Sequence, residues 1–575
     1  MGHPGARSGS SRVSPAEISR NSSSLTTVST TKLGNRMSPG PQIRLPGLIL
    51  ILLIAAAVAW GCNGCNTTAK PPSKSEPPTL RLYLLGGAAG AIEPCGCVKD
   101  MLGGVDHAAA YLAAQTRTVP NQMVVGAGPM LFSDPSLDAD HTKQAAFKAR
   151  ALAESFHDIG LAAWAPGAND WALGAAQLGE LAKLSGAELL AANLKAQKPA
   201  LSATLIRNIN GLKVGLTGVV VGTPRPNLPE GLDYESAVAA LRNAQKTLHA
   251  GGAELQVALI AAPRGDALRL VEQVPGFQLV VLGKPFDQGD LNDEPIPPTI
   301  VGNTLAAQAP NHLQGIATVD LFVRGEDHSF EDGTGVEKLE RKQSLEKRKL
   351  ELEQRIKVWE KNGADQKDLA ARREDLKKLE AEQRALDQAL KPADGSFYTY
   401  QLVDVRESLG VEPKVNGRLV AYYKRVNEHN REVFKDKLPP PVAEGQAGYL
   451  GLEKCGACHL EEVAFWKTTP HANAYETLVK DHKQFNLDCV SCHVTGYEKP
   501  GGTTVTHVLG LTDVQCEVCH GPGSLHVANP ADPALIQATP ARTFCAESCH
   551  HPPHVKKGWS VDDAWKVILG KGHGG

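Results

Sequence analysis

The chain has 575 residues, a formal net charge of −2 and a hydrophobic fraction of 42%. A chain of this length is expected to form more than one domain. Because the charge is nearly balanced and no polybasic segment stands out, we expect no nucleic-acid partner. The composition therefore predicts a globular multidomain protein.

The first 62 residues predict a disordered stretch followed by an export segment. Residues 48–60 are apolar throughout, and about thirteen such residues match the apolar centre of a signal peptide better than a membrane span. Cys62 follows a small residue, as in bacterial lipoprotein cleavage sites. We therefore expect a lipoprotein of the cell envelope that faces the periplasm and is anchored to the membrane at Cys62. An uncleaved anchor and a soluble periplasmic protein are the alternatives. Residues 63–79 form a Pro-rich tether.

Residues 80–325 predict a layered α/β domain. Short apolar runs such as residues 80–87 and 255–263 alternate with amphipathic stretches such as residues 141–160. This alternation is typical of layered α/β architectures. The order of the blocks "LLGGAAGAIEPCG", "VVGAGP", "APGANDWALG", "LLAANL" and "VVLGKP" resembles the calcineurin-like metallophosphoesterases of the periplasmic 5'-nucleotidase type.

This resemblance implies a site for two metal ions, but the residues at its ligand positions differ. Where the family has Asp or His, the chain has Gly87, Ala89, Pro129, Asn169, Ala262 and Lys284. We therefore expect the fold to be present without the hydrolytic reaction, because a fold can outlast its chemistry. An active phosphohydrolase is the alternative.

Two cysteines stand one residue apart in "EPCGC", at Cys95 and Cys97. In an oxidising compartment they can form a structural disulfide or remain buried thiols, which is the interpretation we favour. A redox pair is the alternative, as is a metal site assisted by Asp106 and His107.

Residues 336–391 predict an antiparallel helical coiled-coil hairpin. Leu345, Leu352 and Trp359 recur every seven residues, and "NGA" at residues 362–364 is a turn signal. Its charged positions are expected to face solvent, with self-association or partner docking as a second role. A short connecting region over 396–436 and a linker over 437–448 complete this part of the chain.

Residues 449–575 carry four cysteine motifs, each with a histidine directly after its second cysteine. Disulfides or zinc would explain paired cysteines, but a c-type haem also explains the histidine, which binds the iron. The fourth motif has three residues between its cysteines instead of two. The predicted attachment cysteines are Cys455, Cys458, Cys489, Cys492, Cys516, Cys519, Cys545 and Cys549, and the predicted proximal ligands are His459, His493, His520 and His550.

The second axial ligand of each iron is predicted to be histidine or absent. All five methionines lie before residue 131, so none belongs to the haem region, and bis-histidine ligation favours fairly low potentials. Beyond the proximal set, the available histidines are His471, His482, His507, His526, His551, His554 and His573.

The segments "CGACHLEEVAFWKTTPHANAYETL", "CVSCHVTGYEKPGG", "VQCEVCHGPGSLH" and "WKVILGKGHG" resemble the tetrahaem cytochrome c family typified by the nitrifiers' electron acceptor of hydroxylamine oxidoreductase. The resemblance implies a mainly α-helical and irregular domain with His471, His526 and His573 as distal ligands. It leaves the haem of Cys489, Cys492 and His493 without a sixth ligand.

Two classes of function follow from these features. We favour an electron carrier with four covalently bound haems that exchanges electrons with other redox proteins. No acid, base or substrate pocket can be recognised beside a haem. A reductase that acts on a small substrate at an open haem is the alternative.

Overall fold

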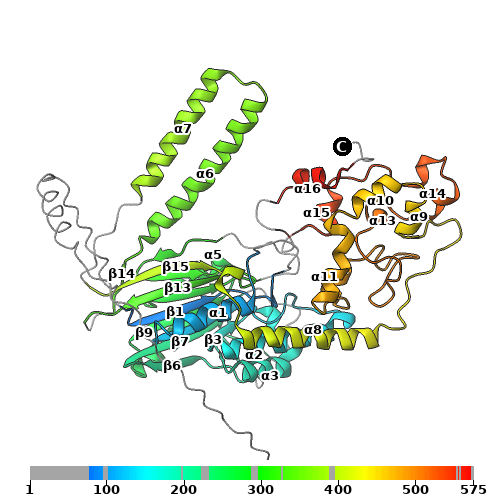
Figure 1. Cartoon of the computed structure of the whole chain (residues 1–575). Coiled ribbons are helices and arrows are strands. Elements are labelled where there is room, and N and C mark those ends of the chain that lie inside the picture. Colours follow the sequence, from blue (N-terminus) through cyan, green and yellow to red (C-terminus); the bar gives the residue numbers. More distant parts are fainter. Residues whose placement is uncertain are drawn as a thin grey trace, which may run out of the picture. The chain divides into compact units, whose positions relative to one another are not determined.

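The computed structural model of the chain describes residues 77–94, 101–195, 199–221, 232–285, 295–325, 328–386, 395–551, 555 and 559–570 (Figure 1). These residues belong to one compact unit, residues 76–575. The predictions for the export segment and for Cys62, Cys95, Cys97, His554 and His573 lie outside the described residues. Within the described ranges, no helix is long and apolar enough to cross a membrane.

A seven-stranded mixed sheet forms the first half of the α/β domain. Four neighbouring strands run parallel in the order β1, β2, β3 and β4, whereas β13 pairs antiparallel with both β1 and β15. In sheet order the strands are β14 (Glu331–Asp332), β15 (Phe397–Asp404), β13 (Gly315–Phe322), β1 (Leu80–Leu85), β2 (Gln122–Gly128), β3 (Leu161–Pro166) and β4 (Glu188–Leu189).

A six-stranded mixed sheet forms the second half. Its central strands run parallel, and an antiparallel strand lies at each edge. In sheet order the strands are β11 (Thr299–Val301), β12 (Thr304–Gln308), β10 (Leu279–Gly283), β9 (Leu255–Ala261), β7 (Leu212–Val220) and β6 (Thr204–Ile209). A small ladder joins β5 (Leu194–Lys195) to β8 (Asp233–Tyr234).

The two sheets pack face to face because alternate residues of each strand point to opposite sides. In β1, Leu82 and Leu84 join Val257 and Val281 of the other sheet in one core, while Tyr83 faces the helices. Each leucine buried in this way contributes about 1.5–3 kcal/mol. The order of layers is helix, sheet, sheet, helix.

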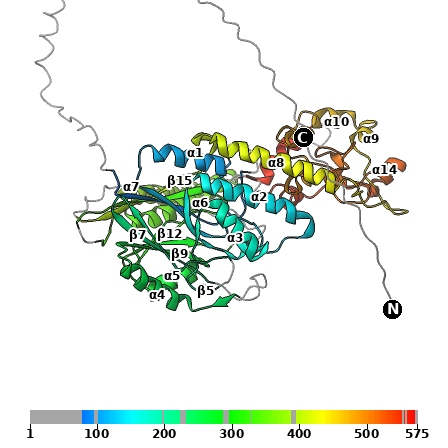
Figure 2. The ribbon, with the colours of Figure 1, turned by 90° about the horizontal axis from the view of Figure 1, so that it is seen from below.

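Helices cover the outer faces of both sheets (Figures 1 and 2). The short helix η1 (Ala168–Trp171) follows β3. The seven-stranded sheet packs against α1 (Val105–Thr116), α2 (Ala139–Asp158), α3 (Gly174–Ser185) and α8 (Pro413–Val433), and the six-stranded sheet against α4 (Ala237–Ala250) and α5 (Arg264–Gln273).

Residues 396–436 are more than the connecting region expected from the sequence. Strand β15 pairs with β13 along its whole length, and α8 contributes Val415, Leu419 and Val426 to the core beside α2. A short helix, η2 (Glu407–Leu409), joins them. The α/β domain therefore resumes after residue 325, and the sequence boundary is corrected in this respect.

Two long helices are inserted between β14 and β15. They are α6 (Val336–Lys361) and α7 (Gln366–Ala385), drawn side by side in Figure 1. Ion pairs join Arg341 to Glu382 and Glu360 to Arg373, so the start of one helix meets the end of the other. The helices are antiparallel, while coiled-coil packing and self-association stay predictions.

The haem region consists of short helices joined by irregular segments. A small apolar core gathers Leu487, Val490, Val494 and Val505 around Phe434, which caps the end of α8. The helices are α9 (Leu452–Gly456), α10 (Leu460–Trp466), η3 (Pro470–Asn473), α11 (Ala474–Lys480), α12 (Leu487–Val490), α13 (Cys516–His520), α14 (Ser524–Ala528), η4 (Pro533–Leu535), α15 (Phe544–Ser548) and α16 (Val561–Ile568).

Candidate haem-binding site

Each of the four cysteine motifs begins on a single helical turn. Cys455, Cys489 and Cys545 lie on α9, α12 and α15, and the third motif forms α13. Residues three or four apart lie on the same face of a helix. Both cysteines of the third motif lie on α13, so one helical turn presents two thiols on one side, as covalent attachment of haem requires. In the other three motifs the second cysteine, Cys458, Cys492 or Cys549, follows the end of the helix.

All eight cysteines of these motifs are free thiols. The thiol of Cys455 is hydrogen-bonded to that of Cys516, which raises the pKa of Cys455 and lowers that of Cys516. A second bond joins Cys492 to Cys549, with the pKa of Cys492 lowered and that of Cys549 raised. The motifs thus approach one another in two pairs, the first with the third and the second with the fourth.

Two of the predicted proximal histidines are oriented by backbone carbonyls. The Nδ1 of His493 lies 2.6 Å from the carbonyl oxygen of Ala474, and the Nδ1 of His520 lies 2.8 Å from that of Gln537. A carbonyl only accepts, so Nδ1 must donate and Nε2 carries the lone pair. Histidines that bind metals are held in this way, and both residues fit the role of an iron ligand.

The remaining proximal histidines are placed differently. The ring of His550 stacks on Trp559 at 5.2 Å between centroids, and His459 is the residue before α10. The ring of His471 lies 6.1 Å from that of His550. Burial lowers the pKa of His471, assisted by the neighbouring His550, so His471 is held in the neutral form that can bind a metal.

His526 has an unpaired buried nitrogen. Among the described residues, its Nδ1 is buried without a hydrogen-bond partner. A buried polar atom is normally satisfied, and an axial bond to iron would satisfy this one. The residue therefore fits the role that the family resemblance assigns to it. His507, by contrast, has its Nδ1 within 3.1 Å of the Thr506 hydroxyl.

The third motif is fixed by a carboxylate inside it. Glu517 is only 2% exposed, and its oxygens accept hydrogen bonds from the backbone of Leu450, Gly451 and Gly523 at 2.7–3.0 Å. The start of the haem region and the turn that leads to His526 are thus tied to α13. Glu517, a charged residue in the middle of a haem motif, therefore stabilises the local structure.

The second motif is held by the α/β domain through a buried amide cluster. Gln144 of α2 donates to Asn486 at 3.0 Å and accepts from Asn430 of α8 and from the backbone of Leu487. Asn486 in turn caps α12 by accepting from the backbone of Asp488 at 2.8 Å. The cluster therefore connects α2 and α8 to the helix that carries Cys489.

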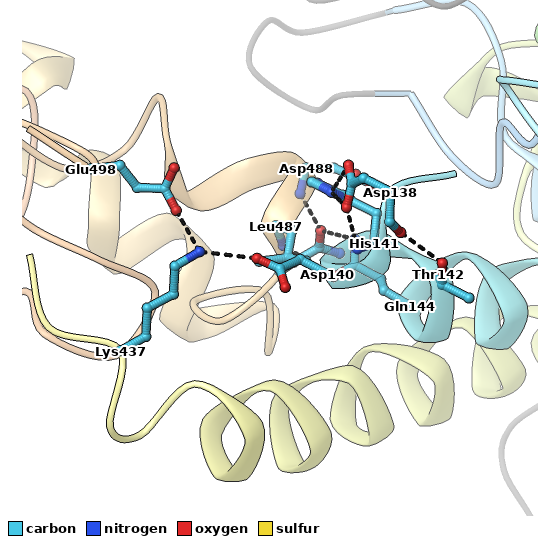
Figure 3. A network of polar contacts seen from close by, with 10 residues as sticks. Asp138, Asp140, His141, Thr142, Gln144, Lys437, Leu487, Asp488 and Glu498 are labelled. Atoms are coloured by element: carbon cyan, nitrogen blue, oxygen red, sulfur yellow. Dashed lines mark hydrogen bonds and ion pairs between the residues drawn. The ribbon is translucent and has the colours of Figure 1, made fainter. Parts of the chain in front are cut away.

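Charged residues surround this amide cluster. Lys148 lies 2.6 Å from Asp488, and Lys437 bridges Asp140 of α2, at 3.0 Å, to Glu498 of the haem region, at 2.8 Å (Figure 3). The bond to Glu498 raises the pKa of Lys437, as does the bond to Asp140. A further ion pair joins Lys483 to Glu93, so both ends of residues 483–488 are fixed by charge.

The positions at which the predicted resemblance implies metal ligands follow the carboxyl ends of β1, β2, β3, β9 and β10. The backbones of these strand ends lie close together. A Cβ added at Gly283 would collide with Ala127, and one added at Gly167 would collide with Pro129. Ala89 has a φ of 48°, in the region that favours glycine. Within the described residues, no group of three His, Cys, Asp or Glu side chains is placed to hold a metal ion.

Asp170 connects two of these strand ends. Its carboxylate is 1% exposed and accepts from the backbone of Met130, Leu131 and Gly167 at 2.8–2.9 Å. Burial raises the pKa of Asp170 to about 6, against the opposing effect of these donors. The residue thus links the loops after β2 and β3.

The four cysteine motifs are recognisable in the sequence, but the contact between the domains is not. Gln144 and Lys148 lie on a helix that reads as an ordinary amphipathic segment, and Asn430 lies in what was expected to be a connecting region. The available signal for this contact was Gln144, a polar residue at a position of α2 that should face the core.

These motifs and oriented histidines are typical of the haem-binding regions of c-type cytochromes. Residues 454–521 match the family described as cytochrome c554 and c-prime. A stretch of 94 residues is 39% identical to cytochrome c-554 of Nitrosomonas europaea, over 13% of this chain and 40% of that protein. The predicted resemblance of this region to that cytochrome family is confirmed. The match spans less than half of the relative's length.

Solved structures similar to the chain include a nucleotidase and a phosphoesterase. One is the 5'-nucleotidase precursor of Thermus thermophilus, 14% identical, with a TM-score of 0.41 over 63% of this chain and 61% of that one. Another is a calcineurin-like phosphoesterase of Bacillus subtilis, 15% identical, with a TM-score of 0.36 over 44% and 86%. The layered α/β architecture itself rests on the two sheets and their helices. After the resemblance predicted from the sequence, we refer to this part of the chain as the phosphoesterase-like domain.

Proposed function

We propose that the protein is an exported electron carrier with four covalent haems, built on a phosphoesterase-like domain that does not hydrolyse phosphate esters. The observation that carries this proposal is a motif repeated four times, in which the first cysteine lies on a short helix and the second is followed directly by a histidine. The similarity to cytochrome c-554 supports the same conclusion for the first three motifs.

Each haem would be attached by the two cysteines of one motif and bound at its iron by the histidine that follows. A c-type haem supplies an iron that accepts and returns a single electron. The carbonyls of Ala474 and Gln537 keep His493 and His520 in the tautomer that such an iron needs. His471, His526 and His573 are the proposed distal ligands.

The phosphoesterase-like domain is proposed to act as a scaffold. The residues at the ligand positions are apolar, amide or cationic, and a two-metal hydrolase needs carboxylates and imidazoles there. Backbone contacts at Gly283 and Gly167 leave no room for a side chain at either position. The contacts of α2 and α8 with residues 483–488 support a structural task in holding the second haem motif.

The cellular setting belongs to the same proposal. Covalent haem is attached after export, which agrees with the apolar segment at residues 48–60 and supports lipid anchoring at Cys62. Other redox proteins would donate and accept the electrons. Self-association through the α6 and α7 hairpin is a secondary proposal.

Intact-mass measurement of the purified full-length protein tests the haem count. We expect four haem additions, three after Cys516→Ser with Cys519→Ser, and an unchanged four after Cys97→Ser, which lies outside the motifs. A wild-type protein with fewer than four additions, or a count that does not change when the third motif is removed, would contradict the proposal.

A further inference from the structure

The phosphoesterase-like domain contacts the residues directly before the haem motif of Cys489, Cys492 and His493. Gln144 holds Asn486 and the backbone of Leu487, and Asn486 caps the helix on which Cys489 lies. These amides are 2% exposed or less, so the contact is buried and fixed. Residues on α2 therefore have a constant position relative to this motif.

Two opposite charges lie next to that buried contact. Lys148 is one helical turn after Gln144 on α2, and its ammonium lies 2.6 Å from the carboxylate of Asp488, the residue directly before Cys489. Their side chains are 23% and 41% exposed. A partly exposed pair of this kind contributes little to stability, and the amide cluster already joins the two domains.

A second ion pair joins the segment before this motif to the phosphoesterase-like domain, with the charges reversed. Lys483 is bound to Glu93, which lies just after β1, and its ammonium is 4.7 Å from the ring centre of buried Tyr423. Asp488, Lys483, Lys148 and Glu93 all act electrostatically on the sulfur of Cys489. Two cations and two anions therefore balance one another around this motif.

We propose that Lys148 of the phosphoesterase-like domain is a positioning residue that sets the reduction potential of the haem held by Cys489, Cys492 and His493, through its pairing with Asp488. This inference rests on the proposed function, because it requires a haem at that motif. It assigns to the phosphoesterase-like domain an electrostatic role in electron transfer.

The sign of the effect follows from the charges. The oxidised haem carries one more positive charge than the reduced haem. Removing Lys148 leaves the negative charge of Asp488 uncompensated, which stabilises the oxidised form and lowers the potential. Removing the charge of Asp488 leaves Lys148 uncompensated and raises the potential. A purely structural role for the pair predicts shifts of the same sign, because either substitution breaks the same contact.

The experiment is a redox titration of the full-length holoprotein followed by electron paramagnetic resonance, which separates the haems by their signals. We expect a lower potential for one haem in Lys148→Met, a higher potential for the same haem in Asp488→Asn, and a return toward the wild-type value in the double variant. Arg150→Met is the matched control. It removes a cation from the same helix, but its partner Glu154 also lies on α2, so the potentials should not change.

Shifts of the same sign in the two single variants, or no shift in either, would overturn the inference. If Lys148→Met is poorly produced, Lys148→Gln takes its place, because the comparison of signs needs one charge removed from each partner. Intact mass of the wild-type protein reports the proposed function separately. Four haem additions with potentials that do not respond to the pair would reject this inference and leave the proposed function intact.

Discussion

The side-chain amide of Gln144 donates a hydrogen bond to the side chain of Asn486 at 3.0 Å, although the two residues are 342 positions apart in the sequence. The first lies on α2 of the phosphoesterase-like domain and the second caps α12 of the haem region. Because both side chains are buried, the bond is protected from competition with water. The two domains thus share a polar core at this point.

Replacing Gln144 by Leu is expected to weaken this contact. The backbone N–H of Leu487 and the amide of Asn430 would lose an acceptor inside a buried region, and an unsatisfied buried donor costs about 1–3 kcal/mol. We expect the free energy of unfolding to fall by that amount and the exposed linker at residues 437–448 to be cleaved faster by protease. Gln245→Leu, which removes one bond at the surface of α4, is the control. An unchanged cleavage rate in Gln144→Leu would contradict the account.

The carboxylate of Asp170 gives a pH-dependent stability with a defined sign. Its pKa is raised from 3.8 to about 6 by burial. The unfolded chain loses this proton near pH 4, whereas the folded protein keeps it until about pH 6. Protonated Asp170 therefore contributes fully to the free energy of unfolding below pH 4. This contribution, about 3 kcal/mol, is lost as the pH rises to 6.

Asp170→Asn isolates this effect because an amide does not titrate. We expect the difference in unfolding free energy between the wild type and Asp170→Asn to shift against the wild type between pH 4 and pH 6. Denaturant unfolding followed by circular dichroism at several pH values measures it. A difference that is constant with pH, or that shifts in favour of the wild type, would show that the folded pKa is not raised.

The phosphoesterase-like domain is expected to be inactive as a hydrolase. With Mn²⁺ or Zn²⁺ present, the purified protein should hydrolyse neither 5'-nucleotides nor p-nitrophenyl phosphate above the rate without protein. The physical reason is the residues at positions 87, 89, 129 and 169, which offer no carboxylate or imidazole to a metal ion. A metal-dependent activity that disappears in Asn169→Ala would overturn this prediction.

One haem is expected to lack a sixth ligand. Only His471, His526 and His573 are proposed as distal ligands for four irons, and the family resemblance leaves the iron of His493 open. The oxidised protein should therefore show a high-spin signal in electron paramagnetic resonance, and His493→Met should alter that signal. Low-spin signals alone would mean that His482, His507 or His554 closes the site. A high-spin signal that His493→Met does not alter would place the open site at another haem.

The layered α/β architecture could be predicted because its strands are continuous apolar runs. Residues 80–85, 212–220, 255–261 and 279–283 are nearly uniform in apolar character, as expected of parallel strands buried on both faces. The return of β15 and α8 to the same domain could not be predicted, because 64 residues separate the end of β14 from the start of β15. Local patterns do not report pairing over such a distance.

The haem motifs could be read directly because the chemistry fixes the spacing of their residues. The contact around Gln144 and Asp488 could not, since polar residues on separate helices carry no local signature of pairing. The bond from His493 to the carbonyl of Ala474 was likewise hidden, because a carbonyl is present at every residue. The sequence therefore predicted the residues that chemistry requires, and the structure added those that position them.

The most direct test of the central claim is a coulometric redox titration of the purified full-length protein with optical spectra. We expect each chain to take up and return four electrons reversibly, at the fairly low potentials that histidine ligation gives. Reversible uptake of fewer than four electrons per chain, or haem spectra that do not respond to the applied potential, would contradict it.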